Sequence, residues 1–284
     1  MEILTLTEKN LSYKMKTARK RILGTYSKCL RNFFFAVFFA FFIFSSCGLD
    51  NYYYLDAPLQ SGHIASHTTE APDEQYFSCI TNEEAGNSDF FSNASEFTFL
   101  GTDFYYRIYN NISQCQSVNS RVSGMISSTT YTSATEYLIS TAGYKNLKIH
   151  YGTIQPLIEA GASPDNRYVY IRITRGTTDD YEKAIRIGSS GIKSSVEGDP
   201  LLFGSTPVYP VRIIENKGFE FSNSDSANPV PKSGDEDFLY SSSPTEEGSY
   251  YVDMYAVSVG RDSSYTESYS QPYHMGTIKI TVDD

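Results

Sequence analysis

The chain has 284 residues, of which 33 are acidic and 23 are Lys or Arg, giving a formal net charge of −10. A surface of this sign repels phosphate backbones and anionic headgroups, so the composition argues against nucleic acid as a partner. The length suffices for one large domain or two small ones.

The N-terminal segment has the three parts of an export signal. Eight Lys and Arg residues lie before an apolar run at 33–44, and Ser45, Ser46 and Cys47 follow it. A helix that spans a membrane needs roughly 20 apolar residues, which is more than this run supplies. The order therefore predicts that 1–46 are a signal peptide. An uncleaved anchor and cleavage without lipid are the alternatives.

The residues Phe44-Ser45-Ser46-Cys47 resemble the lipobox of bacterial lipoprotein precursors, in the relaxed form of spirochaete lipoproteins. Phe44 stands where that family usually has an aliphatic residue. The resemblance implies that Cys47 carries the lipid and becomes the first residue of a membrane-anchored, extracytoplasmic protein, either periplasmic or surface-exposed. Without its first 46 residues the chain keeps 15 basic and 31 acidic side chains, a formal net charge of −16. Membrane contact is therefore expected through the lipid and not through a basic patch.

The remaining composition predicts a mainly β fold. The chain holds 24 Tyr and no Trp, and Tyr and Thr suit half-buried pleated surfaces better than helices. Strong helix formers are comparatively scarce. We expect an antiparallel β-sandwich with one or two short helices inserted.

Residues 47–73 mix aromatic, small and polar residues without a sustained period, which predicts a flexible tether. His63 and His67 within it are expected to be solvated. Strand-like segments follow at 75–80, 95–100 and 103–110, and the residues around Gly101 predict a turn between the last two.

Helical spacing of apolar residues predicts one amphipathic helix over 113–125, and 134–142 is a second candidate. Further strands are expected in six segments: 146–151, 167–174, 184–187, 208–214, 218–222 and 238–241. Within 167–174, strict alternation predicts a strand with one buried face.

The last two predicted strands, 250–259 and 275–282, resemble the end of a fibronectin type III or immunoglobulin-like sandwich. The segment 97–110 similarly resembles the paired central strands of such a domain. Two β-rich domains, 74–195 and 205–284, are the preferred division. The alternative is one sandwich over 74–284 with a large insertion.

Two cysteines, Cys79 and Cys115, remain after the signal and the lipidated residue. In an exported protein they are a candidate disulfide, which would stabilise the fold by about 3–4 kcal/mol on the chain-entropy model. The alternative is a pair of buried free thiols. No CxxC or paired His spacing indicates a metal site.

Tyr105, Tyr109, Tyr168 and Tyr170 lie on predicted strands. On a solvent-facing sheet, Tyr is good contact material for a protein or a glycan ligand. Packing against a neighbouring sheet or helix is the alternative.

No motif for nucleotide binding or for hydrolysis occurs, so no cofactor is expected. His150 and His274 are expected to be structural. Asp179, Asp180 and Glu182, like the acidic run 235–237, lie in turn-like sequence and read as solvated charges, with calcium binding by the run as an alternative. The sequence thus predicts a lipid-anchored envelope protein, not an enzyme, with a binding, adhesion or structural role. A hydrolase acting on glycan or peptide is the alternative, and it would need one of the first three acids to face another acid across a cleft.

Overall fold

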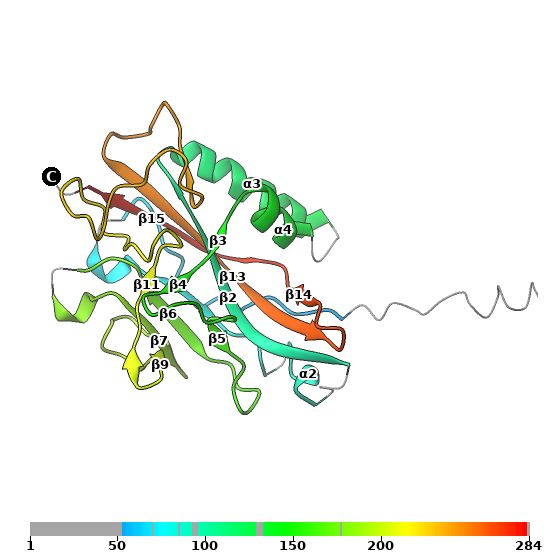
Figure 1. Cartoon of the computed structure of the whole chain (residues 1–284). Helices are drawn as coiled ribbons and strands as arrows, with labels where there is room; N and C mark the ends of the chain where they lie inside the picture. The colour runs from blue at the N-terminus through cyan, green and yellow to red at the C-terminus, as the bar shows by residue number, and fades with distance from the viewer. Residues whose placement is uncertain are drawn as a thin grey trace, which may run out of the picture. The chain divides into compact units, whose positions relative to one another are not determined.

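The structure is a computed structural model, and it describes residues 53–69, 71–84, 86–92, 96–128, 133–176 and 178–282. The chain from Tyr53 onward forms one compact unit (Figure 1). The predicted signal peptide, 1–46, and Cys47 lie outside the described residues.

Two sheets carry most of the fold (Figure 1). The first has the antiparallel order β1 (Phe77–Ile80), β6 (Tyr168–Arg172), β7 (Ala184–Gly188) and β8 (Asp199–Pro200). The second has the order β12 (Phe238–Leu239), β2 (Phe97–Tyr109), β13 (Ser249–Asp262) and β14 (Glu267–Tyr269), with β15 (Tyr273–Thr281) also on β13 and with β3 (Lys145–Asn146) and β5 (Ile158–Glu159) on β2.

Short ribbons and helices complete the fold. The ribbons pair β9 (Leu202–Phe203) with β10 (Thr206–Pro207), and β4 (Lys148–Ile149) with β11 (Pro210–Val211). The helical elements are η1 (Pro72–Glu74), α2 (Asp89–Ser92), α3 (Ile112–Ser128), α4 (Ser133–Glu136), the π-helical turn η2 (Tyr137–Thr141) and η3 (Asp179–Tyr181). The predicted mainly β, antiparallel class is confirmed, although β12 pairs with β2 in parallel.

The core lies between the two sheets, and a second apolar layer lies on the other face of the larger sheet. Phe77 and Ile171 of the first sheet pack in one buried cluster with Phe104 and Met254 of the second. On the opposite face, β2 and β13 place Tyr105, Tyr109, Tyr251 and Tyr255 against α3 and α4, in a cluster that includes Val122 and Leu138. Both faces of the larger sheet are therefore covered.

The strand β2 is continuous where the sequence predicts a turn. Gly101 lies inside it with φ +142°, and a Cβ at this position would stand 2.1 Å from the carbonyl oxygen of Ile158. Opposite, Val259 pairs with Gly101 and Gly260 pairs with Phe99, which leaves Leu100 without a partner in β13. The glycine therefore marks a β-bulge that lets β5 approach, and not a reversal of the chain.

The predicted helix over 113–125 is confirmed by α3, and 134–142 is confirmed by α4 with η2. The strands at 167–174, 250–259 and 275–282 are also confirmed, but β6 is buried on both faces instead of one. The segment 218–222 is not a strand. Phe219 and Phe221 alternate there because a loop inserts both rings into the core.

The region 195–205 is not a domain boundary. Ile187 of β7 pairs with Asp199 of β8, and β4 pairs with β11 across the same region. Contacts between the residues from Tyr53 onward group them into one compact unit, which includes both 74–195 and 205–284.

Residues 53–69 are part of the fold and not a free tether. Leu55 is buried, Leu59 forms a bridge with Ile80, and Ala65 forms a parallel bridge with Gly276. The spacing of apolar residues in the sequence does not indicate that this segment is ordered. Each of its anchors is a single side chain or a single bridge, which leaves no repeating pattern. His63, expected to be solvated, stacks on the ring of Tyr76 at 3.9 Å.

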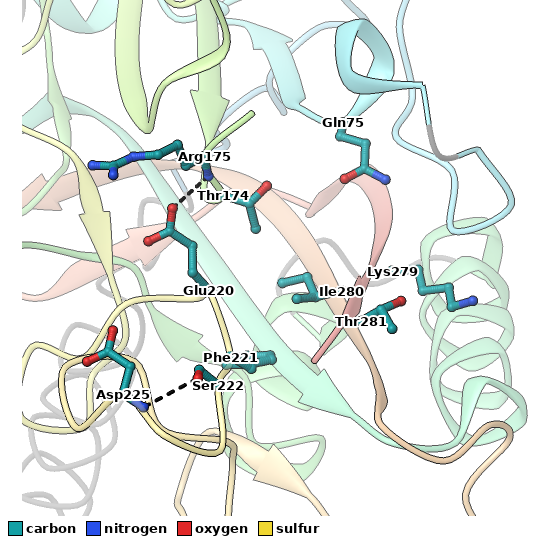
Figure 2. A pocket seen from close by; sticks show the side chains of 10 residues that line it. All are labelled: Gln75, Thr174, Arg175, Glu220, Phe221, Ser222, Asp225, Lys279, Ile280 and Thr281. Atoms are coloured by element: carbon teal, nitrogen blue, oxygen red, sulfur yellow. Dashed lines mark hydrogen bonds between the residues drawn. The ribbon is translucent and has the colours of Figure 1, made fainter. Parts of the chain in front are cut away.

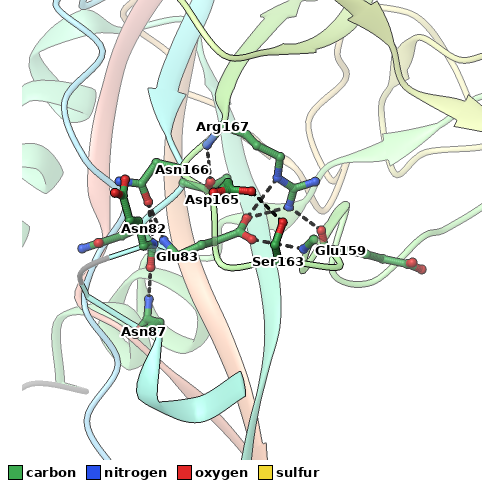
Figure 3. A network of polar contacts seen from close by, with 11 residues as sticks. Asn82, Glu83, Asn87, Glu159, Ser163, Asp165, Asn166 and Arg167 are labelled. Atoms are coloured by element: carbon green, nitrogen blue, oxygen red, sulfur yellow. Dashed lines mark hydrogen bonds and ion pairs between the residues drawn. The ribbon is translucent and has the colours of Figure 1, made fainter. Parts of the chain in front are cut away.

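A polar network holds this segment and the loop after β1 in place (Figure 3). Asn87 Nδ2 donates to the carbonyl oxygen of Asp56, and the N–H of Asp56 donates to Asn87 Oδ1. Nearby, the fully buried carboxylate of Glu83 accepts from Arg167 Nη2 at 2.6 Å and from the N–H of Gly161 at 3.1 Å. A buried charge is tolerated when it is paired and hydrogen-bonded in this way.

Candidate functional site

A pocket of about 470 Å³ opens where the end of β15 meets two loops (Figure 2). Four segments distant in sequence line it: Gln75 after η1, Thr174 and Arg175 after β6, the loop residues Glu220, Phe221, Ser222 and Asp225, and Lys279, Ile280 and Thr281 at the end of β15. Volumes of this order hold small-molecule ligands.

Strand pairing fixes one wall of the pocket. Thr281 pairs with Ser249 and Ile280 with Tyr250 at the beginning of β13. The ring of Phe221 meets the ring of Tyr250 edge-on, with centroids 5.1 Å apart. The loop that carries Phe221 is thereby tied to the sheet by a buried aromatic contact.

The charged groups of the lining are paired with groups outside it. Glu220 Oε2 accepts from Lys183 Nζ at 2.8 Å, and Arg175 Nε donates to Glu182 Oε2 at 2.9 Å. The N–H of Arg175 itself donates to Glu220 Oε1 at 2.8 Å.

The two remaining charges of the lining are balanced in the same way. Lys279 Nζ lies 2.7 Å from Glu246 Oε2. Asp225 accepts from the N–H of Ala227 and from Asn228, and these hydrogen bonds hold the pKa of its exposed carboxyl below the ordinary value. The two cations and two anions of the lining therefore leave the pocket close to neutral.

Several polar atoms of the lining have no protein partner among the described residues. They are the hydroxyls of Thr174 and Thr281, the oxygen Oε1 of Gln75, and the terminal nitrogens Nη1 and Nη2 of Arg175. Gln75 and Thr174 lie on one side of the space and Ile280 and Thr281 on the other (Figure 2). The pocket thus offers donors, acceptors and apolar surface together.

A second polar cluster lies buried between the larger sheet and α3. The carboxylate of Asp253 is fully buried and accepts from Tyr144, Thr277, Asn119 and His274, whose Nε2 is 2.9 Å away. Burial raises the pKa of Asp253, but the His274 charge and these hydrogen bonds outweigh it, and the pKa is lowered. Burial lowers the pKa of His274, but the nearby charge of Asp253 raises it by more. The pKa of His274 is therefore raised overall.

Cys115 belongs to this cluster, with its Sγ 3.8 Å from Thr277 Oγ1. The combination of a thiol, an imidazole and a carboxylate is found in cysteine-based nucleophiles. Here the thiol is fully buried, and burial together with the Asp253 charge raises its pKa. A high thiol pKa opposes the thiolate that such chemistry needs, so we assign the cluster to fixing α3 on the sheet.

The acidic run 235–237 is bound by cations of the protein. Arg212, itself buried, donates from Nη2 to Asp237 Oδ1 at 2.7 Å and to Asp235 Oδ2 at 2.8 Å. Glu236 Oε2 lies 3.1 Å from Lys145 Nζ. These acids form internal ion pairs in place of the solvated charges that the sequence predicts, and they do not converge on a calcium site.

Cys79 and Cys115 are free, buried thiols in separate clusters on opposite faces of the larger sheet. The disulfide is therefore absent, as in the alternative of two free thiols. Because Cys79 packs between the sheets and Cys115 faces them from α3, the sheet itself separates the two sulfurs.

Tyr105, Tyr109, Tyr168 and Tyr170 form no contact surface, because none of them is more than 6% exposed. The first two pack under the helices, and the second pair packs with Tyr76 and Ile192. Alternation correctly indicates strands here. It does not show that other elements cover the second face.

Of the acids proposed for a hydrolase, Asp179 and Asp180 lie exposed on η3, and Glu182 pairs with Arg175 at the edge of the pocket. The lining residues were not predicted, since their four segments come together only in the folded chain.

No family model, no curated protein and no solved structure matches this chain. In the part of the chain that the structure describes, no helix has the length and hydropathy to cross a membrane. The same residues contain no group of three or more His, Cys, Asp or Glu placed to hold a metal ion.

Proposed function

We propose that this protein is a lipid-anchored, extracytoplasmic binding protein that holds its pocket away from the membrane. Cys47 carries the lipid in this account, and the pocket that begins at Gln75 takes the ligand. The observation that supports it most is the position of the pocket relative to the start of the folded chain.

The pocket and Tyr53 lie at opposite ends of β13. The ring of Tyr53 stacks on Phe97 with centroids 4.6 Å apart, and Phe97 pairs with Asp262, the last residue of β13. Thr281, in the pocket lining, pairs with Ser249, the first residue. A strand of 14 residues is about 40 Å long at roughly 3.3 Å per residue.

The attachment point is close to the Tyr53 end. Five residues separate Cys47 from Tyr53, and such a segment spans at most about 20 Å when fully extended. A lipid at Cys47 therefore keeps the Asp262 end near the bilayer and leaves the pocket facing outward.

The contacts of the pocket favour binding over hydrolysis. A glycosidase needs one carboxyl that acts as an acid and a second that faces it across the substrate. In the lining, Glu220 is held by Lys183 and by the N–H of Arg175, and Asp225 is held by its own loop. Protein groups therefore hold each carboxylate in place as part of the pocket wall.

The lipid anchor is tested by Cys47→Ala in the full-length chain. We expect the wild-type protein in the membrane fraction, resistant to high salt and released by detergent, and the variant in the soluble fraction. Equal membrane association of both proteins would contradict the anchor.

The binding role is tested by capture from intact envelopes with residues 48–284, which include the whole compact unit. The variant Thr281→Trp fills the exposed rim of the pocket, and Thr206→Trp is the matched control on the exposed β10. We expect a protein or glycan that the wild type and the control capture and the rim variant does not. Capture that is insensitive to the rim variant would contradict a role for the pocket.

A further inference from the structure

We infer that the ligand of this pocket is an uncharged carbohydrate, a neutral oligosaccharide segment recognised through its hydroxyl groups. The inference rests on the proposed binding function and names the chemical class of its ligand. It follows from two properties of the lining: charges that are already balanced, and polar atoms without partners.

The balanced charges argue against an ionic ligand. An anion at Arg175 would lie next to Glu220 and Glu182, which are both bonded to that arginine. A cation at Glu220 would face Lys183, which lies 2.8 Å from its carboxylate. Either ion would have to compete with the partner that already compensates the charge. A neutral ligand meets no such competition.

The unpartnered polar atoms match a ligand rich in hydroxyls. Each sugar hydroxyl both donates and accepts, as the hydroxyls of Thr174 and Thr281 do. Gln75 Oε1 adds an acceptor. These three oxygens line the pocket and have no other partner among the described residues. The guanidinium of Arg175 points away from them (Figure 2), and its Nε pairs with Glu182.

Apolar side chains close the base of the pocket. Phe221 and Ile280 line it but are only 2% and 6% exposed, so they offer a ligand little surface. Recognition therefore rests on the few placed polar groups of the lining.

The test measures binding by calorimetry with three trisaccharide types of matched size. The neutral probes are maltotriose, cellotriose and triacetylchitotriose, the cationic probe is deacetylated chitotriose, and the anionic probe is trigalacturonic acid. We expect at least one neutral probe to bind ten times or more tighter than both charged probes. Binding of a charged probe as tight as the best neutral one would overturn the inference.

Variants locate the binding and probe the charge balance. Thr174→Val keeps the shape and removes one hydroxyl, and we expect it to weaken the neutral probe about 5–10-fold, the usual worth of one hydrogen bond. Thr206→Val, on exposed β10, is expected to leave it unchanged. Lys183→Met removes the partner of Glu220 and is expected to raise the affinity for deacetylated chitotriose relative to its acetylated form. Equal effects of the two threonine variants, or no change of preference in Lys183→Met, would overturn the inference.

Failure of the ligand class is separable from failure of the binding role. If no neutral probe binds but envelope capture still depends on the rim of the pocket, the pocket binds another class of ligand. If capture is insensitive to the rim as well, the binding role fails too.

Discussion

The backbone N–H of Arg175 donates a 2.8 Å hydrogen bond to Glu220 Oε1 and joins two loops that are 45 residues apart in the chain. The other oxygen of Glu220 is held by Lys183. One carboxylate therefore connects the loop after β6 to the loop that carries Phe221, and these contacts fix two walls of the pocket. The same contacts leave the pocket without an excess of either charge.

The close approach of the N-terminal segment to β15 makes Gly276 sensitive to substitution. Its φ is +108°, and a Cβ would stand 2.1 Å from the carbonyl oxygen of Ala65. We expect Gly276→Ala to lower the free energy of unfolding in urea by more than about 2 kcal/mol, because β15 and the segment at Ala65 would have to separate.

The matched control for this substitution is Gly204→Ala. Gly204 also has a positive φ, +64°, but no atom lies within 4 Å of the added Cβ. We expect a loss of about 1 kcal/mol, from the left-handed backbone alone. Equal losses at both glycines would show that residues 53–69 are not held on the sheet.

Asp103 is predicted to make stability fall as the pH rises. Burial raises the pKa of this carboxyl from 3.8 to about 6, against the hydrogen bonds from Leu157 and Asn146. The folded state therefore binds the proton more tightly, so the full stability is present below about pH 4 and is lost as the pH rises through about 6. A shift of about two units corresponds to roughly 3 kcal/mol.

The variant Asp103→Asn removes this dependence. Asn146 Oδ1 is buried without a partner and can accept from the new amide once the side chain of Asn146 turns. We expect a variant that is more stable than wild type at pH 7 and about equally stable at pH 4, measured by urea unfolding. The half-buried Asp262→Asn, whose carboxyl accepts from its own turn, is expected to give no gain. A variant that is less stable than wild type at pH 7 would contradict the proposal that burial of the Asp103 carboxylate destabilises the fold at that pH.

His274 gives a second test of pH dependence, in this case for an ion pair. Its pKa is raised by Asp253, so its contribution is complete below pH 6.5 and is lost as the pH rises through the raised value. The imidazole is 36% exposed, and solvent limits the contribution to about 1 kcal/mol. We expect the stability difference between wild type and His274→Gln to narrow as the pH rises from 6 to 9. A stability difference that does not change with pH would mean that the charge of His274 contributes nothing to stability through Asp253.

The two thiols are expected to be reduced and unreactive in the native protein. Burial raises the pKa of Cys79 and, with the Asp253 charge, that of Cys115. In residues 48–284 without reductant, a thiol reagent is expected to modify two groups in denaturant and none in native buffer. Reductant is expected to leave the melting temperature unchanged. Absence of reactive thiols in denaturant would indicate the disulfide.

The parts of the fold that follow from local pattern are visible in the sequence. Val252 and Met254 alternate with Tyr251 and Tyr255 in β13, and the helical spacing of Cys115 and its neighbours gives α3. Alternation defines the two faces of a strand but does not show which elements cover them. The pattern therefore cannot show that α3 lies on the face that carries the tyrosines. The tyrosines therefore suggest a contact surface where the fold has a second core.

The pocket is invisible in the sequence for a related reason. Gln75 and Thr281 are separated by almost the whole folded chain, and each is an ordinary polar residue in its own segment. Their meeting depends on long-range pairing, in particular on β15 lying beside β13. The predicted N-terminal signal is different, since its parts are contiguous in the chain.

The central claim is that the lipid end and the pocket end of the protein lie on opposite sides of the fold. It is tested most directly by placing fluorophores at Ser263→Cys, beside the Asp262 end, and at Ser226→Cys, beside the pocket. Both positions are exposed, and neither serine side chain makes a hydrogen bond among the described residues, whereas Cys79 and Cys115 are buried. The lipidated protein is bound to vesicles that carry a quencher in their headgroups. The account predicts strong quenching at position 263 and little at 226, and equal quenching, or stronger quenching at 226, would contradict it.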